Sequence, residues 1–183
     1  MRVFWKMDSV ISLKLKDDLY TLAQMVNTVS KMRFFNVFRD NDEWGGIDLN
    51  GVDSLFCVSV GNVVIQRLGQ RRVSLEEVKP GRAPCERFFI DPFENYDGYN
   101  LRGEFLWRGG RLVDLGEDSL GIARNAPSVI QNLSLEQNRD VIKKFEMSGM
   151  WGADQILGRL IRFHSTGVNR DPMKEKVFPG LYD

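Results

Sequence analysis

The chain has 183 residues, with 25 basic and 25 acidic side chains, so its formal net charge is zero. This balance argues against a dedicated nucleic-acid binder, which usually carries a basic excess, and against a uniformly acidic DNA mimic. Its length and hydrophobic content of 43% are typical of one globular domain, which we expect to span residues 1–183. With no visible secretory signal and no long apolar run, we expect a cytoplasmic protein.

The first forty residues predict three consecutive antiparallel strands. Apolar and polar residues alternate over 10–16, which is typical of a strand with one buried face. The pair Asp17-Asp18 supplies turn chemistry, and strand formers resume at 19–26. A second turn at 27–31 precedes the apolar run 32–38. Because its contacts are local, this meander should nucleate a sheet.

Two further hairpins are expected before residue 115. The apolar run 55–60 reads as a buried strand, with Gly61-Asn62 as a two-residue turn and 63–65 as its continuation. A second hairpin at 103–115 would turn at Gly109-Gly110, because glycine adopts the positive backbone angles of such turns.

After residue 115 the pattern changes to helical spacing. Ser134 with Gln137 predicts a capped helix start, and a second helix should begin near Ala153. The tail from Thr166 is polar and contains prolines, so we expect a surface loop there.

The order of elements predicts the fold class. Residues 1–115 are mainly β and residues 134–164 helical, so we expect an α+β protein. The sheet should be antiparallel and strongly bent, or a small barrel, in the first two-thirds of the chain, with the C-terminal helices packed against it.

Residues that could carry out catalysis or bind metal are few. His164 is the only histidine, and we favour a packed or capping role for it over a catalytic one. Cys57 and Cys85 have no CxxC spacing, so we expect free thiols and no zinc site. A calcium loop counted from Asp40 would need glutamate at its last position, where Gly51 stands. We therefore expect no metal and no cofactor.

The strongest candidate site is a pair of acidic, aromatic loops. Aromatic anchors flanked by carboxylates suit a basic protein partner, because the ring supplies burial and the charge steers encounter. The alternative is that Trp44 packs under its own loop and the acids only aid solubility. The candidate partner-binding residues are Asp40, Asp42, Glu43, Trp44, Asp48 and Asp53 in the first loop, and Glu94, Tyr96, Asp97 and Tyr99 in the second.

The opening strand, turn and strand resemble the start of the immunity protein 26 family. Matching positions are Lys6, Asp8, Ile11, Leu13, the turn Asp17-Asp18, Tyr20, Gln24 and Met25. The chain departs from that pattern at Met7, Ser9, Lys14 and Asp18. The resemblance covers about the first forty residues and implies an antitoxin without catalytic residues, which neutralises a toxin delivered by neighbouring bacteria.

We therefore expect an immunity protein of the contact-dependent growth inhibition type. It would block a toxin domain, such as a basic nuclease or RNase, and would contact neither nucleic acid nor membrane directly. One alternative is a nucleic-acid or other ligand-binding β-barrel that uses Arg67, Arg71, Arg72 and Arg82. Another is a hydrolase that depends on His164.

Overall fold

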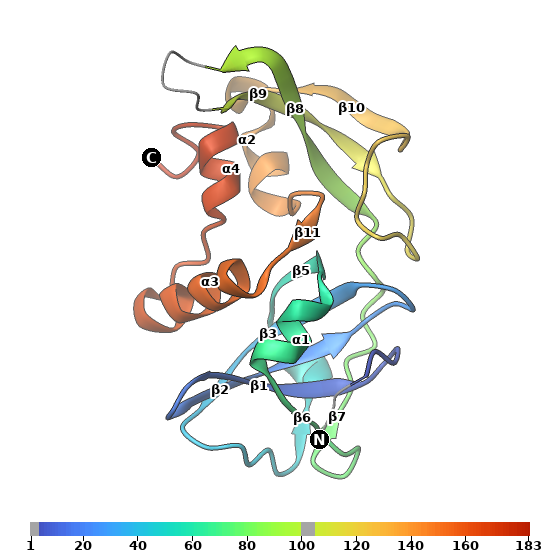
Figure 1. Cartoon of the computed structure of the whole chain (residues 1–183), viewed down its shortest axis with the longest axis vertical. Helices are drawn as coiled ribbons and strands as arrows, with labels where there is room; N and C mark the ends of the chain where they lie inside the picture. Colours follow the sequence, from blue (N-terminus) through green and yellow to red (C-terminus); the bar gives the residue numbers. More distant parts are fainter. Residues whose placement is uncertain (1–3, 100–104) are drawn as a thin grey trace. The chain divides into compact units, whose positions relative to one another are not determined.

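The computed structural model describes residues 4–99 and 105–183, with side chains described for residues 4–93 and 109–183. The chain divides into two compact units (Figure 1). Unit 1 comprises Met1–Cys85, Glu117–Gly121 and Met150–Arg170, and unit 2 comprises Glu86–Gly116, Ile122–Gly149 and Asp171–Asp183. That the two units fold as a single domain stays a prediction.

Unit 1 contains a curled six-stranded half-barrel, in the order β11-β5-β3-β2-β1-β6. All neighbouring pairs are antiparallel except β11 and β5. The strands are β1 (Val10–Lys16), β2 (Leu19–Met25), β3 (Lys31–Arg39), β5 (Ser54–Val60), β6 (Gly69–Arg72) and β11 (Met150–Trp151). The predicted α+β class with a bent sheet is confirmed.

The predicted meander forms the centre of this sheet. Lys16 pairs with Leu19, so Asp17-Asp18 is the two-residue turn between β1 and β2. Alternation along β1 places Ile11 and Leu13 in the main core. The resembling segment therefore folds as the strand, turn and strand that its pattern predicts.

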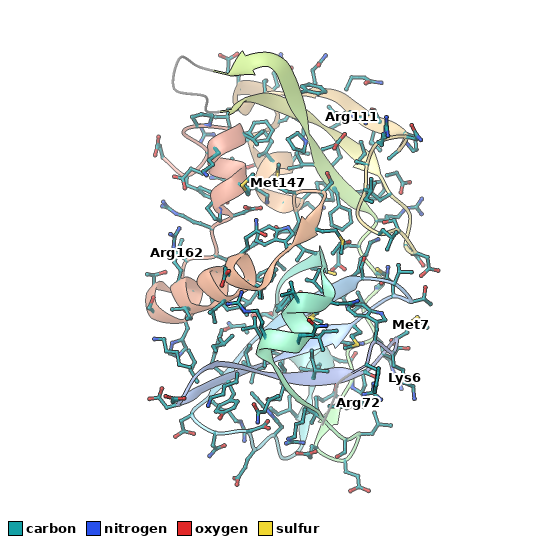
Figure 2. All side chains as sticks on the ribbon, in the orientation of Figure 1. Lys6, Met7, Arg72, Arg111, Met147 and Arg162 are labelled. Atoms are coloured by element: carbon teal, nitrogen blue, oxygen red, sulfur yellow. The ribbon has the colours of Figure 1, made fainter. Side chains whose placement is uncertain are left out.

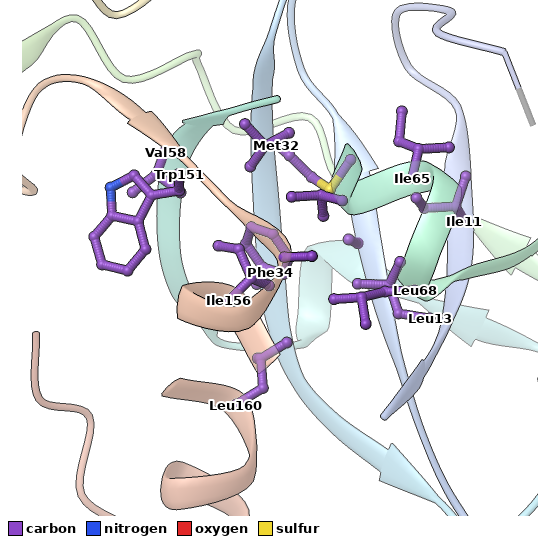
Figure 3. Close-up of a cluster of buried hydrophobic side chains, with 14 of the residues drawn as sticks. Ile11, Leu13, Met32, Phe34, Val58, Ile65, Leu68, Trp151, Ile156 and Leu160 are labelled. Atoms are coloured by element: carbon purple, nitrogen blue, oxygen red, sulfur yellow. The ribbon is translucent and has the colours of Figure 1, made fainter. Parts of the chain in front are cut away.

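Two helices cover the inner face of the half-barrel: α1 (Asn62–Leu68) and α3 (Ala153–Thr166). Figure 3 shows Ile65 and Leu68 from α1, and Ile156 and Leu160 from α3, in the same cluster as Phe34 of the sheet. Helical spacing on both helices places these apolar side chains on one face each.

The predicted hairpin at Gly61-Asn62 is wrong, because α1 starts there. Val64, Ile65 and Leu68 recur at helical spacing and are buried together. The helix ends at Gly69, where an added Cβ would lie 2.5 Å from the carbonyl oxygen of Ile65. Only glycine allows that close approach, so the chain can pass directly from α1 into β6.

The opposite face of the half-barrel packs on a smaller apolar cluster. Trp44, Val10, Leu22 and Val73 belong to it. A short parallel pair and a 3-10 turn border this cluster: β4 (Ile47–Asp48), β7 (Val78–Lys79) and η1 (Leu49–Gly51).

Unit 2 is a three-stranded antiparallel sheet with two helices, in the strand order β10-β9-β8. Its elements are β8 (Phe88–Tyr99), β9 (Phe105–Asp114), β10 (Ser128–Leu133), α2 (Leu135–Lys144) and α4 (Pro172–Val177). Ser134 caps α2 as predicted, because its hydroxyl accepts from the N–H of Gln137.

Three sequence expectations fail in unit 2. Gly109 and Gly110 lie inside β9 rather than at a turn; a Cβ on Gly110 would lie 2.6 Å from the carbonyl oxygen of Asp91, so close strand pairing requires this glycine. The expected loop at 94–99 has its backbone in β8. The tail contains α4, capped by Asp171.

Among the described residues, no helix is long and apolar enough to cross a membrane.

Candidate functional site

The acidic loop, residues 40–53 of unit 1, connects β3 to β5. Its predicted site residues fall into two groups. The side chains of Asp40, Glu43 and Asp53 are exposed, and no hydrogen bond or ion pair of these carboxylates is found among the described residues. The carbonyl of Asp53 accepts from the N–H of Asn36 in β3, 2.9 Å away, which fixes the end of the loop beside the strand it follows.

Trp44 is not the exposed anchor that the sequence predicts. Its side chain is only 1% exposed and packs in the cluster with Val10 and Val73. Its indole Nε1 donates to Asp42 Oδ1 at 2.8 Å, and the Arg39 guanidinium lies 5.6 Å above its ring centroid. The indole therefore packs beneath its own loop, as the alternative states for Trp44, and is too buried to contact a partner.

Arg71 joins the acidic loop to β6 through two carboxylates. Its Nε donates to Asp42 Oδ2 at 2.9 Å, and its terminal nitrogens donate to both oxygens of Glu77 at 2.9 and 2.6 Å. One terminal nitrogen also donates to the Asp42 carbonyl at 2.9 Å. The bonds from Arg71 lower the pKa of Glu77 to about 2, and those carboxylates raise the pKa of Arg71. Asp42 is therefore part of the scaffold.

Glu77→Gln should reduce stability at neutral pH and leave it nearly unchanged in acid. The folded pKa of Glu77 lies below its usual value of about 4.3, so the stabilisation is present above that value and lost as pH falls towards about 2. The urea midpoints of wild type and Glu77→Gln should differ at about pH 6, and the difference should shrink below about pH 4 and disappear only as pH falls through about 2. Glu76→Gln, at the exposed neighbour, is the matched control. A midpoint difference independent of pH would contradict the ion pair.

Asp48 is exposed, but its carboxylate accepts hydrogen bonds that stabilise the loop. Its carboxylate accepts from Lys79 Nζ at 2.9 Å and caps η1 through the N–H of Asn50 at 3.0 Å. The bond from Lys79, followed by those from Asn50, lowers the pKa of Asp48 to about 2. The loop therefore uses Asp42 and Asp48 for its own structure, and leaves three carboxylates facing solvent.

The second predicted patch lies outside the described side chains. The backbone of Glu94, Tyr96, Asp97 and Tyr99 belongs to β8. Their part in partner binding stays a prediction.

Two of the four arginines of the nucleic-acid-binding hypothesis form ion pairs within the protein. Arg67 forms a bidentate ion pair with Asp154, with N···O distances of 3.1 and 2.8 Å. Arg71 is paired with Asp42 and Glu77. Arg72 and Arg82 are exposed. Two of the four cations therefore already carry protein carboxylates, which weakens their case as a phosphate-binding surface.

The remaining candidates for chemistry are dispersed. His164 is exposed on α3, with its ring 5.0 Å from that of Phe38. Cys57 is buried and Cys85 half-buried, and the two are not joined by a disulfide, as expected. Within the described ranges, no three His, Cys, Asp or Glu side chains gather as metal ligands would.

A buried polar layer on the outer face of the sheet was not predicted from the sequence. Lys31 Nζ donates to the carbonyl of Glu117 at 2.9 Å, and Arg33 donates to the carbonyls of Ala83 and Pro84. Gln24 exchanges two hydrogen bonds with the backbone of Gly81, at 3.0 and 2.9 Å. The signal was the alternation of Lys31 and Arg33 with apolar residues in β3, which places both on one face.

The comparisons with known proteins give one match. The family DUF8309, described as a domain of unknown function, matches residues 1–183. No curated protein and no solved structure matches the chain.

Proposed function

Because this chain belongs to the DUF8309 family, which is described as a domain of unknown function, we propose its function from its own surface. The protein is an immunity protein that binds and neutralises a toxin domain. The partner is a basic protein, such as a nuclease, whose active-site region is covered by the acidic loop. The protein acts by binding alone and carries out no reaction.

One observation carries this proposal: buried contacts fix the acidic loop, and its exposed surface carries carboxylates. Trp44, Asp42 and Arg71 fix its base, and Lys79 fixes Asp48. The loop that carries the exposed carboxylates is therefore held in place before a partner arrives. Preorganisation of this kind reduces the entropy lost on binding, and complementary charge accelerates encounter.

The opening strands support the immunity assignment in particular. The segment that resembles immunity protein 26 forms the β1–β2 hairpin at the centre of the half-barrel. The exposed position of His164, beside a phenylalanine ring, lends no support to the hydrolase alternative. The ion pairs of Arg67 and Arg71 favour the protein-binding hypothesis over the nucleic-acid-binding one.

The test is neutralisation of the C-terminal domain of a large secreted protein encoded next to this chain. Co-expression should restore growth of cells that produce that domain, and calorimetry should give nanomolar affinity. Asp40→Lys, Glu43→Lys and Asp53→Lys combined should weaken binding by at least about 30-fold, because three attractive contacts become repulsive. Growth should then no longer be restored.

A matched control reverses three exposed carboxylates elsewhere: Asp18→Lys, Glu136→Lys and Asp140→Lys. This variant has the same net charge as the loop variant, so general electrostatics are equal in both. It should bind within about threefold of wild type. If both variants lose affinity equally, only net charge matters and the acidic loop is not the binding site. If no neighbouring domain is neutralised, the immunity function itself is wrong.

A further inference from the structure

We infer that the edge strand β6 accepts an extended strand of the partner protein, so that binding adds a seventh strand to the half-barrel. This inference rests on the proposed function, because it concerns the partner of the same acidic surface. It goes further by stating how the partner's backbone is held and which kind of segment is recognised.

The first step is the open edge. β6 is the last strand in its sheet and pairs only with β1. The N–H of Val73 donates to the carbonyl of Val10 at 3.0 Å, and Arg72 lies opposite Ile11. Because inward and outward groups alternate along an antiparallel strand, the N–H and C=O of Arg72 point away from β1. Among the described residues, no backbone group pairs with them on that side.

The second step is the apolar side chains that flank this edge. Leu75, three residues after β6, is 77% exposed, and Phe4 is 66% exposed. Arg72 donates to the carbonyl of Phe4 at 2.8 Å, which places Phe4 next to the strand. Figure 2 shows Arg72 on the side of unit 1 where Lys6 and Met7 also lie. An added strand would bury these two apolar side chains, as strand addition usually does through alternate positions.

The third step is the charge beside the edge. The Arg71 side chain extends from β6 and donates to both Asp42 and Glu77. The acidic loop and the turn after β6 are therefore both close to this strand. Five carboxylates lie in the acidic loop and the turn after β6, against four cations near this edge; the acids are Asp40, Asp42, Glu43, Glu76 and Glu77, and the cations are Lys6, Arg39, Arg71 and Arg72. The occupant is therefore an extended segment in which basic residues alternate with apolar ones.

The probe is an end-blocked peptide of about ten residues in which lysine and valine alternate. A second peptide has the same sequence with N-methyl groups on alternate residues, which removes backbone donors but keeps charge and side chains. Amide spectra of the full chain should show micromolar to millimolar binding of the first peptide, with slowed exchange of the Arg72 N–H. The methylated peptide should bind about fivefold to tenfold more weakly.

Two variants at one position separate backbone from side chain. Arg72→Pro removes the outward N–H, and proline is tolerated on an edge strand when that group faces solvent. Arg72→Ala removes the side chain and keeps the N–H. We expect Arg72→Pro to bind the peptide about fivefold to tenfold more weakly than Arg72→Ala. Equal affinities in the two variants, or equal affinities of the two peptides for wild type, would overturn strand addition.

The outcomes separate this inference from the proposed function. If reversal of Asp40, Glu43 and Asp53 abolishes neutralisation while Arg72→Pro neutralises fully, the immunity function stands and strand addition is wrong. If Arg72→Pro does not fold, the comparison of the two peptides on wild type decides alone. No detectable binding at millimolar peptide also overturns the inference.

Discussion

Trp44→Ala is expected to lower the free energy of unfolding by about 3–5 kcal/mol, the usual cost of removing a buried tryptophan. The indole fills the cluster between the sheet and the acidic loop, so alanine would leave a cavity against Val10 and Val73. It would also remove one of the two side chains that donate a hydrogen bond to the Asp42 carboxylate. Urea unfolding, with the midpoint and slope fitted together, measures the change.

Trp44→Phe is the control, because it keeps most of the ring volume and loses only the bond to Asp42. Asp42 still accepts from Arg71, so the expected loss is about 1 kcal/mol. Partner affinity should fall for Trp44→Ala and change little for Trp44→Phe, because the indole supports the loop without touching the partner. A Trp44→Ala variant as stable as wild type would contradict this structural role of the indole.

The parts of the fold that were predictable depend on local pattern. The three-stranded meander, the turn at Asp17-Asp18 and the capped start of α2 all follow from residues close together in sequence. Alternation and capping act over a few residues, so the sequence alone is enough to indicate them.

The failures arise where tertiary packing decides between two local patterns. Residues 62–68 have both strand-forming composition and helical spacing, and burial on the half-barrel selects the helix. Gly109-Gly110 resembles a turn, but the close approach of β8 and β10 requires glycine within a strand. Such contacts join residues far apart in the chain, so no local pattern contains them.

The candidate site was predicted in outline and not in detail. The acidic loop is present, but its most prominent residue, Trp44, faces inward. Sequence composition cannot distinguish a carboxylate that faces solvent from one that accepts a structural hydrogen bond, and Asp42 and Asp48 belong to the second kind. The cations that occupy them, Arg71 and Lys79, lie about thirty residues later in the chain and could not be assigned to them in advance.

Asn27→Ala is expected to cost about 3–5 kcal/mol, although it removes a small polar side chain. Asn27 is 1% exposed. Its Oδ1 accepts from the N–H groups of Val29, Ser30 and Lys31, at 3.2, 2.9 and 2.8 Å. Its Nδ2 donates to the carbonyls of Glu117 and Ser119, at 3.2 and 3.3 Å. Alanine would leave several buried groups unsatisfied, at about 1–3 kcal/mol each before relaxation.

Thr28→Ala is the matched control, because it changes the adjacent residue of the same turn. Its exposed hydroxyl makes one long bond to Asp118, at 3.4 Å, so the expected cost is below about 0.5 kcal/mol. Hydrogen exchange should then report faster exchange of the Ser30 and Lys31 amides in Asn27→Ala only. If the two variants unfold at the same urea concentration, solvent can replace the amide of Asn27 and the turn does not fix the segment at 117–121. A large difference means that the β2–β3 turn fixes this segment to the sheet.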